Sequence, residues 1–303
     1  MSKVIRIGTR DSQLALWQAH TVKTQLEALG YKTELVPVKS IGDLVLDKPL
    51  YELGITGIFT KTLDIAMLNG TVDIAVHSMK DVPTLLPTGI VQTAVLERAT
   101  SLDILVINGA PNFEERCTIA TGSLRRKAQW LHRYPKHEVV GLRGNVNTRL
   151  QKLQDNPWQG AIFAKAGLER IEVLPENHIP LDWMIPAPSQ GAMVVVALES
   201  DVYCKEATAK LNVTNAQICT HIERAFLRVL EGGCTAPIGA IAKITDNEVH
   251  FKGVLFSLDG QIKLEVKRSS SIDQYETFGR ICALRLLEHG GKELMESIKK
   301  EMP

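Results

Sequence analysis

The chain has 303 residues, of which 45% are hydrophobic and 23% charged, with a formal net charge of +1. A chain of this length predicts two or three domains whose hydrophobic cores need no disulfide or metal. The five cysteines form neither a CxxC pair nor a Cys/His set at zinc spacing, so we expect no disulfide framework and no metal site. Neither a secretion signal nor an uncharged run of about 18 residues occurs, and we expect a cytoplasmic protein without membrane contact.

The amino-terminal segment predicts a strand, a loop and a helix. Residues 4–8 are rich in β-formers, and Asp11 or Ser12 can cap the helix that follows and ends at Gly30. Arg10 and Ser12 thus lie at a helix amino terminus, where free N–H groups and the helix dipole favour an anion. Capping alone would also account for Ser12, so the pattern leaves both interpretations open.

A polar motif directly follows a buried strand. The strand is predicted at residues 72–76, and Ser78, Lys80 and Asp81 come just after it. Open α/β sheets bind ligands at the carboxyl ends of their strands, so these side chains mark a candidate site. A solvated Lys-Asp pair in a surface loop is the alternative, and we expect His77 to be a structural histidine.

A second α/β unit begins after a crossing at residues 97–100. Its first helix begins at Ser123, and Pro135 follows the end of that helix. Arg125 and Arg126 lie in the first turn, where the helix dipole disfavours cations unless an anion is nearby, so their position favours a ligand. The other strands of the two units are predicted at residues 33–38, 91–96, 102–107, 118–121, 139–142 and 160–164.

Positive charge is concentrated in the second unit. Between Arg116 and Lys152 there are nine lysines and arginines against the single acidic residue Glu138. A solvated basic face, a nucleic-acid site or a site for small carboxylated ligands would each fit this excess. The basic residues are spread over several elements and no aromatic series is interleaved with them, so we expect carboxylated ligands and no nucleic acid.

A second crossing at residues 186–191 returns the chain to the first unit, because the apolar run 193–198 suits a central strand. The expected fold class is α/β, with two lobes joined by two crossings and a smaller C-terminal α+β domain. The expected domains are residues 1–96 with 193–214 for the first lobe, residues 97–192 for the second, and residues 215–303 for the third domain.

A cysteine follows two glycines at the end of a long helix predicted at residues 215–231. Gly232 and Gly233 carry no Cβ, so a bulky group can approach the thiol of Cys234 on an open turn. A buried cysteine at a glycine-rich helix end is the alternative. The rest of the domain is predicted as strands at residues 238–244, 249–256 and 262–268 and helices at residues 273–288 and 292–301.

The segment 231–239 around Cys234 and five further motifs occur in an order that resembles the porphobilinogen deaminase family nearly from end to end. Six motifs in the same order form a far more specific signal than one glycine-rich loop. The five further motifs are Arg6-Ile7-Gly8-Thr9-Arg10, His77-Ser78-Met79-Lys80-Asp81-Val82-Pro83, Thr121-Gly122-Ser123-Leu124-Arg125-Arg126, Leu142-Arg143-Gly144-Asn145-Val146-Asn147-Thr148-Arg149 and Pro188-Ser189-Gln190-Gly191-Ala192.

The resemblance implies a fold, an activity and a cofactor. The fold is two lobes around a cleft, like those of a periplasmic binding protein. The activity is that of a transferase, hydroxymethylbilane synthase, which joins four porphobilinogen molecules head to tail and releases ammonia and hydroxymethylbilane in tetrapyrrole (haem) biosynthesis. The cofactor is a dipyrromethane held by a covalent thioether at Cys234, and the enzyme is expected to act as a monomer.

The resemblance also implies roles for individual residues. Asp81 is the expected catalytic residue, placed over the pyrrole N–H groups to stabilise developing positive charge. Gln190 contacts the ligand or braces the crossing, and Phe59 packs over a pyrrole ring or belongs to the core. The expected cofactor-binding residues are Ser78, Lys80, Thr121, Ser123, Arg125 and Arg126. The expected substrate-binding residues are Arg10, Ser12, Arg143, Arg149 and Arg170.

The sequence departs from the family pattern at one position, and it is also compatible with one competing class of protein. Most members of the family have a lysine between two glycines in the loop before Phe59, where this sequence has Thr56. A non-enzymatic binding module would share the two-lobed cleft. Such a module needs neither Cys234 after two glycines nor a third domain, so the sequence favours the enzyme.

Overall fold

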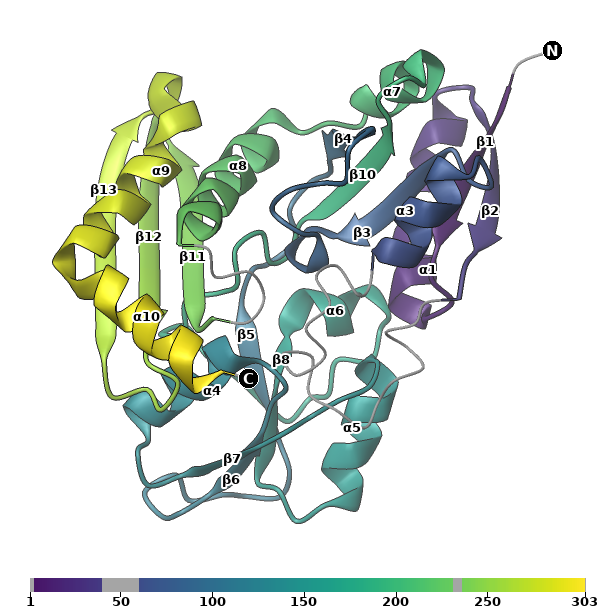
Figure 1. Cartoon of the computed structure of the whole chain (residues 1–303). Coiled ribbons are helices and arrows are strands. Elements are labelled where there is room, and N and C mark those ends of the chain that lie inside the picture. The colour runs from purple at the N-terminus through teal and green to yellow at the C-terminus, as the bar shows by residue number, and fades with distance from the viewer. Residues whose placement is uncertain (1–2, 40–59, 231–235, 303) are drawn as a thin grey trace.

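The computed structural model describes residues 3–39, 60–230 and 236–302. In these residues the chain forms two five-stranded sheets and one three-stranded sheet, each with its own helices (Figure 1). This arrangement confirms the expected class of two α/β lobes with a smaller α+β domain. Thr56, Phe59 and Cys234 lie outside the described residues, so the expectations for them are not tested here.

The first lobe is built on a sheet with the strand order β2-β1-β3-β10-β4. Strand β1 is parallel to β2 and β3, whereas β10, which returns from the far end of the second lobe, is antiparallel to both of its neighbours. Its elements are β1 (Val4–Thr9), α1 (Gln13–Ala28), β2 (Lys32–Pro37), α3 (Lys61–Leu68), β3 (Ile74–Ser78), β4 (Ile90–Val95), β10 (Met193–Leu198) and α7 (Val202–Ala209).

The nearly continuous apolar run of β10 is explained by helices on both faces of the sheet. Met193, Val195 and Ala197 pack in the cluster that includes residues of α1 and α7. Val194 and Val196 pack in the cluster that includes residues of α3. Because successive side chains of a strand point to opposite faces, a strand covered on both sides requires apolar residues throughout.

The second lobe has the strand order β7-β6-β8-β5-β9. Strand β6 is parallel to β7 and β8, and β5 is antiparallel to β8 and β9. The short edge strand β9 was not predicted, since its three residues include a proline and give no alternating pattern. The elements are β5 (Asp103–Ile107), β6 (Thr118–Ala120), α4 (Leu124–Arg133), β7 (Glu138–Val140), α5 (Val146–Asp155), β8 (Gly160–Ala164), α6 (Lys165–Arg170) and β9 (His178–Pro180).

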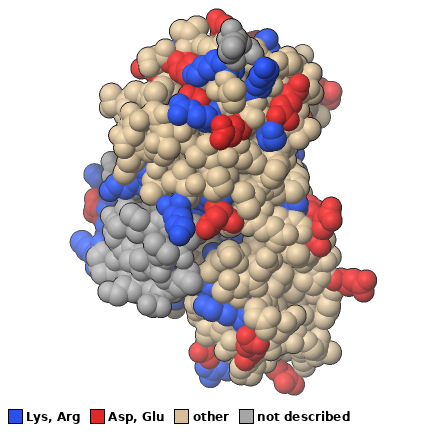
Figure 2. Space-filling model, turned by 90° about the vertical axis from the view of Figure 1, so that its right-hand side faces the viewer, with Lys and Arg blue, Asp and Glu red and all other residues tan. Residues whose placement is uncertain are grey.

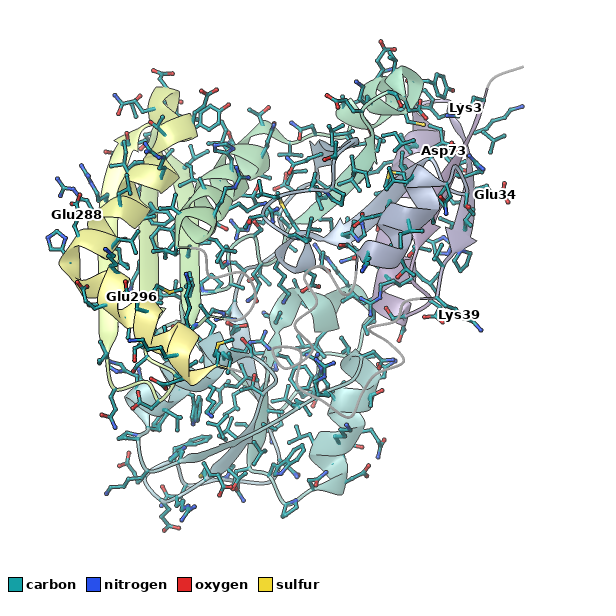
Figure 3. The ribbon with its side chains drawn as sticks, viewed as in Figure 1. Lys3, Glu34, Lys39, Asp73, Glu288 and Glu296 are labelled. Carbon is teal, nitrogen blue, oxygen red and sulfur yellow. The ribbon has the colours of Figure 1, made fainter. Side chains whose placement is uncertain are left out.

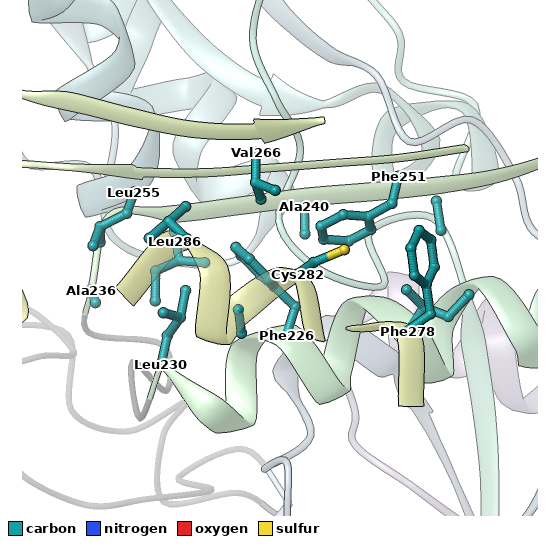
Figure 4. Close-up of a cluster of buried hydrophobic side chains, with 14 of the residues drawn as sticks. Phe226, Leu230, Ala236, Ala240, Phe251, Leu255, Val266, Phe278, Cys282 and Leu286 are labelled. Atoms are coloured by element: carbon teal, nitrogen blue, oxygen red, sulfur yellow. The ribbon is translucent and has the colours of Figure 1, made fainter. Parts of the chain in front are cut away.

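The third domain is an antiparallel meander, β11-β12-β13, covered by helices. Its core contains Phe226, Phe251, Phe278 and Cys282, all buried between the sheet and the helices (Figure 4). The helices α9 and α10 are joined at residues Leu287–Gly291. The elements are α8 (Thr214–Val229), β11 (Ile238–Thr245), β12 (Glu248–Phe256), β13 (Lys263–Ser271), α9 (Tyr275–Leu286) and α10 (Lys292–Glu301).

The two crossings between the lobes lie against each other and against α8. The backbone N–H of Ala99 donates to the carbonyl of Gly191 at 3.2 Å. Gly191 has φ +89°, and a Cβ there would lie 2.5 Å from the carbonyl oxygen of Ala99, so only glycine fits. The fully buried carboxylate of Glu223, on α8, accepts bonds from Arg98 at 2.7 and 3.0 Å and from the N–H of Ser189 at 2.6 Å. One carboxylate of the third domain therefore binds both crossings.

The two ends of the first sheet differ in character. Lys3 and Asp73 precede β1 and β3, and their side chains form an ion pair at 3.3 Å at the amino end of these strands (Figure 3). Asp73 also accepts two bonds from the Arg6 guanidinium. The charges at this end thus pair with one another within the protein, and the candidate residues of the polar motif lie at the opposite end.

The surface carries both signs of charge. Figure 2 shows lysines and arginines interspersed with aspartates and glutamates over the face that it presents. This mixture of both signs agrees with the net charge of +1. Among the described residues, no helix is both long enough and apolar enough to cross a membrane.

Candidate active site

In the first lobe, the candidate residues gather where parallel strands end. Arg10 follows β1, Ser78 ends β3, and Lys80 and Asp81 lie in the short 3-10 helix η2 (Met79–Asp81). Because β1 and β3 are parallel neighbours, their carboxyl ends meet at one edge. Arg10 is near enough to His77 for its charge to affect that imidazole. The sequence motifs of the first lobe therefore do form one polar edge.

The hydroxyl groups of this edge already have partners in the protein. Ser12 is the N-cap of α1, and its side chain accepts from the N–H of Ala15 at 3.4 Å. Ser78 accepts from the side-chain amide of Gln18 on α1 at 2.8 Å. Ser12 thus has the capping role that was one of its two interpretations, and Ser78 is held against the helix that Ser12 begins.

His77 is buried beside this edge and stays neutral. Burial, together with the positive charge of Arg10, lowers the pKa of His77 to about 4. Only 6% of the residue is exposed, and its Nε2 atom has no hydrogen-bond partner within the described part of the chain. These observations agree with the expectation of a structural, uncharged histidine.

In the second lobe, a pocket opens between the loops after β6 and β7. Ser123 caps α4 by accepting from the N–H of Arg126, and the hydroxyl of Thr121 accepts from the N–H of Ser123. The pocket has a volume of about 190 Å³, and its charged lining residues are two cations, Lys127 and Arg143. The described residues that line it are Thr121, Gly122, Ser123, Leu124, Lys127, Val139, Val140, Gly141, Leu142 and Arg143. A basic pocket without a carboxylate suits an anionic group.

Arg125 and Arg126 both bind the buried carboxylate of Asp103. Arg125 donates to Asp103 at 2.7 Å, and Arg126 donates to it at 2.8 and 3.0 Å. All three side chains are almost inaccessible to solvent. Burial alone would raise the pKa of Asp103, but the two guanidinium groups outweigh burial and hold that pKa well below its usual range. The anion inferred from the position of these arginines is thus supplied, in this structure, by the protein itself.

Gln190 connects this buried cluster to the first lobe. Its amide nitrogen donates to Asp103 at 2.9 Å, and its amide oxygen accepts from the ammonium of Lys80 at 3.3 Å. Burial and the charge of Arg126 lower the pKa of Lys80 to about 8, although Asp81 and Asp103 act in the opposite direction. Gln190 therefore braces the crossing, as one of its two interpretations predicted, and also contacts a candidate ligand-binding residue.

Arg149 brings the second lobe close to Asp81. Burial and the charge of Arg126 lower the pKa of Arg149 to about 10, and the carboxylate of Asp81 acts in the opposite direction. Its Nε atom donates to the carbonyl of Gly144 at 2.7 Å, which fixes the guanidinium near the start of α5. Asp81 from one lobe and Arg149 from the other thus share one electrostatic environment.

Arg170 lies apart from this group. Its guanidinium donates to the carbonyl of Gly191 at 2.7 Å and lies 5.5 Å from the ring centroid of Trp17 on α1. It therefore links α6 of the second lobe to the second crossing and to the first lobe. In this structure its contacts are those of an interlobe brace.

The sequence analysis missed two residues of the site. Asp103 was included in a predicted strand, and a charged residue at the start of an apolar strand is the signal that indicates a buried partner. Lys127 lies one helical turn after Ser123 and so faces the same side of α4, a spacing that could have added it to the candidate set.

Two models of known protein families match most of the chain. Residues 5–206 match the model described as "Porphobilinogen deaminase, dipyromethane cofactor binding domain". Residues 217–288 match the model described as "Porphobilinogen deaminase, C-terminal domain". Together the two models cover both lobes and most of the third domain.

Curated relatives match over almost their whole length. A porphobilinogen deaminase from Syntrophotalea carbinolica is 38% identical over 98% of this chain and 96% of its own. Those from Geobacter sulfurreducens and Moorella thermoacetica are 39% and 40% identical, over 99% and 98% of this chain and 98% and 97% of their own. Among solved structures, the probable amino-acid ABC transporter extracellular-binding protein ytmK from Bacillus subtilis matches 70% of this chain and 90% of its own, at 12% identity and a TM-score of 0.43.

Proposed function

The chain belongs to the porphobilinogen deaminase family, and we propose that Cys234 anchors its dipyrromethane cofactor and that Asp81 is its catalytic group. The activity is the stepwise head-to-tail condensation of four porphobilinogen molecules, with release of ammonia and hydroxymethylbilane, in tetrapyrrole biosynthesis. The match of both family models, with relatives aligned over nearly their full length, is the observation that carries this function.

The other four cysteines support Cys234 as the attachment point by their chemistry. Each of them is buried, and burial raises the pKa of every one of these thiols, to about 12 for Cys204 and about 11 for Cys219 and Cys282. A thiol is nucleophilic as a thiolate, so a buried thiol with a raised pKa is a poor site for attachment. Cys234, after two glycines, is the remaining thiol.

Intact-protein mass spectrometry tests the attachment. The purified protein should exceed the 33.5 kDa chain by the mass of one dipyrromethane, and Cys234→Ser should lose this increment together with activity. The same substitution at Cys117, which is buried in the second lobe, should leave the increment in place. A fully active wild-type protein with the mass of the bare chain would exclude covalent attachment.

The polar groups of the site fit a ligand that carries carboxylates. The pocket beside Ser123 is lined by Lys127 and Arg143 without an acidic residue, and Arg149 lies near both Arg143 and Asp81. Guanidinium and ammonium groups are the side chains that best bind carboxylates. We assign to this role the residues Arg10, Ser12, Ser78, Lys80, Thr121, Ser123, Lys127, Arg143 and Arg149. We assign a mainly structural role, holding this set in place, to Arg125, Arg126, Arg170 and Gln190. Contact with the ligand is a secondary role of these four residues.

The position of Asp81 supports its proposed catalytic role. The bound dipyrromethane would supply the pyrrole carbon to which porphobilinogen units are added. Positive charge develops on pyrrole nitrogen during such additions, and a fixed carboxylate stabilises that charge. Asp81 lies in η2 at the polar edge, next to Lys80 and facing the environment of Arg149. The surrounding cations hold the carboxylates of the ligand while Asp81 meets its nitrogens.

The domain division also stays a proposal. We assign residues 1–96 with 193–214 to the first lobe, 97–192 to the second and 215–303 to the third domain. The separate sheets support this division, since β10 pairs only with strands of the first lobe in the described residues. A purely ligand-binding protein needs no covalent cofactor, so its wild-type chain would have the bare mass and Cys234→Ser would change nothing; the same mass experiment therefore distinguishes this role.

A further inference from the structure

A guanidinium group of the third domain donates hydrogen bonds to the backbone on both sides of Asp81. Arg224, on α8, donates to the carbonyl oxygens of Met79 at 3.3 Å, Val82 at 3.0 Å and Pro83 at 2.5 Å. These three carbonyls lie on both sides of Asp81 in the chain. The contacts join residues more than 140 positions apart in the sequence, so they link two domains and not one local turn.

A second arginine extends the contact. Arg228, one helical turn after Arg224, donates to the carbonyl of Thr84 at 2.7 Å. It is exposed, and its acceptor lies three residues beyond Asp81. Arg228 therefore touches the same segment without touching the residues next to the carboxylate, which makes it a matched control for Arg224.

The segment to which Arg224 donates, residues 79–83, has little regular secondary structure of its own. It consists of a single 3-10 turn, closed by the N–H of Val82 donating to the carbonyl of Met79 at 3.2 Å, and then extended chain. Pro83 has no N–H to donate, so this part of the segment is fixed mainly through its acceptors. Three donors from one planar guanidinium set the directions of three carbonyls at once.

The helix that supplies Arg224 is anchored in the core of the third domain. Ile222 and Phe226, the neighbours of Arg224 on α8, are fully buried in the core of the third domain. Glu223, the adjacent residue, binds both interlobe crossings through Arg98 and Ser189. Two consecutive residues of α8, Glu223 and Arg224, thus connect the interlobe crossings and the Asp81 turn to the same helix.

We propose that Arg224 is a positioning residue for catalysis, which aims the carboxylate of Asp81 by fixing the backbone of residues 79–83. The inference rests on the proposed catalytic role of Asp81. It predicts that Arg224 acts through Asp81 and contributes nothing once that carboxylate is gone. It also gives the third domain a part in the chemistry besides carrying Cys234.

A double-mutant cycle tests this relationship. Single-turnover rates are measured for Arg224→Gln, Asp81→Asn and the double variant, each confirmed by mass to hold the cofactor and by thermal unfolding to be folded. Arg224→Gln alone should slow the chemical step about tenfold or more while KM changes less than threefold, as expected when a transition-state interaction is lost. Added to Asp81→Asn, it should change the rate less than twofold, because coupled residues are not additive.

The controls separate positioning from general stability. Arg228→Gln should keep the wild-type rate within about twofold, since one exposed contact outside the turn is lost. Arg224→Lys, which retains a donor and a charge, should recover part of the rate and provides a folded alternative if Arg224→Gln is unstable. Amide hydrogen exchange in residues 79–84 should be faster in Arg224→Gln than in the wild type.

Two outcomes would overturn the inference in distinguishable ways. If Asp81→Asn is impaired and Arg224→Gln is not, or if the two losses simply multiply in the double variant, Arg224 does not act through Asp81 and the proposed catalytic role stands. If Asp81→Asn itself turns over normally, the catalytic assignment fails and the inference fails with it.

Discussion

The side-chain amide of Gln190 donates to the carboxylate of Asp103 at 2.9 Å, and this bond connects the interlobe crossing to the most deeply buried ion cluster of the second lobe. The same carboxylate is shared by Arg125 and Arg126. Since Gln190 also accepts from Lys80, the position of Lys80 depends on charges that lie in the other lobe. The candidate site is thus braced by residues that do not face its pocket.

Asp103→Asn should destabilise the protein strongly. The substitution keeps the shape of the side chain but leaves two buried guanidinium groups without their counter-charge. Breaking a buried ion pair in this way typically costs about 3–5 kcal/mol. Urea unfolding followed by circular dichroism would measure the loss. Asp182→Asn, an exposed position of the same lobe, is the control, and an equal stability of the two variants would contradict the structural role of Asp103.

Asp81→Asn should abolish most of the activity without unfolding the protein. The amide retains the size of the side chain but not the charge that balances developing cationic nitrogen, and loss of one such preorganised contact costs about 3–4 kcal/mol, or roughly two to three powers of ten in rate. Asp81→Glu keeps the charge one methylene away and should retain partial activity. Single-turnover assays on cofactor-loaded protein would measure both, and a normal rate in Asp81→Asn would return Asp81 to an ordinary solvated carboxylate.

Lys127→Gln should weaken ligand binding in the pocket beside Ser123. A hydrogen bond to a charged group contributes about 1.5–3 kcal/mol, so kcat/KM should fall about tenfold or more if Lys127 binds a carboxylate of the growing chain. Mass spectra should show covalent intermediates of intermediate length accumulating. The exposed Lys136, in the loop after α4, serves as control through Lys136→Gln. Equal activity of the two variants would remove Lys127 from the site.

The protein should become less stable as the pH is lowered from about 6.5 to 4, because His77 is held neutral in the folded state. Burial lowers the folded-state pKa of His77 to about 4 from its ordinary value of 6.5, so in this window the unfolded chain binds a proton that the folded chain excludes. The stabilisation is therefore complete above pH 6.5 and is lost as the pH falls through 4, with a total of about 3 kcal/mol.

Urea unfolding across this pH range, compared between the wild type and His77→Gln, measures the contribution of this group. The variant should show a smaller slope of unfolding free energy against pH in this window, although its absolute stability can differ. Identical slopes would mean that His77 is not held neutral in the folded protein.

Local features of the fold could be predicted from the sequence because they depend on residues close together in the chain. Ser12 and Ser123 cap helices at the expected positions, since a cap needs only the N–H groups of the next turn. The apolar run 193–198 predicted a central strand correctly, because a strand that is buried on both faces needs an apolar residue at nearly every position. The order of the motifs likewise identified the family, and the assignment of Cys234 still depends on the sequence alone.

Contacts between distant charges were decided by the tertiary structure. Arg125 and Arg126 indicated an anion from their place in a helix, but only the folded structure shows that Asp103, at the start of β5, supplies it. Arg224 lies on a helix of the third domain, and nothing within a few residues of it indicates that it binds the backbone beside Asp81. Sequence patterns indicate which residues are buried or exposed, whereas the partner of a particular charge depends on how separate elements pack. This is why the sequence analysis found the motifs of the candidate site but not the carboxylate of Asp103 or the contacts of Arg224.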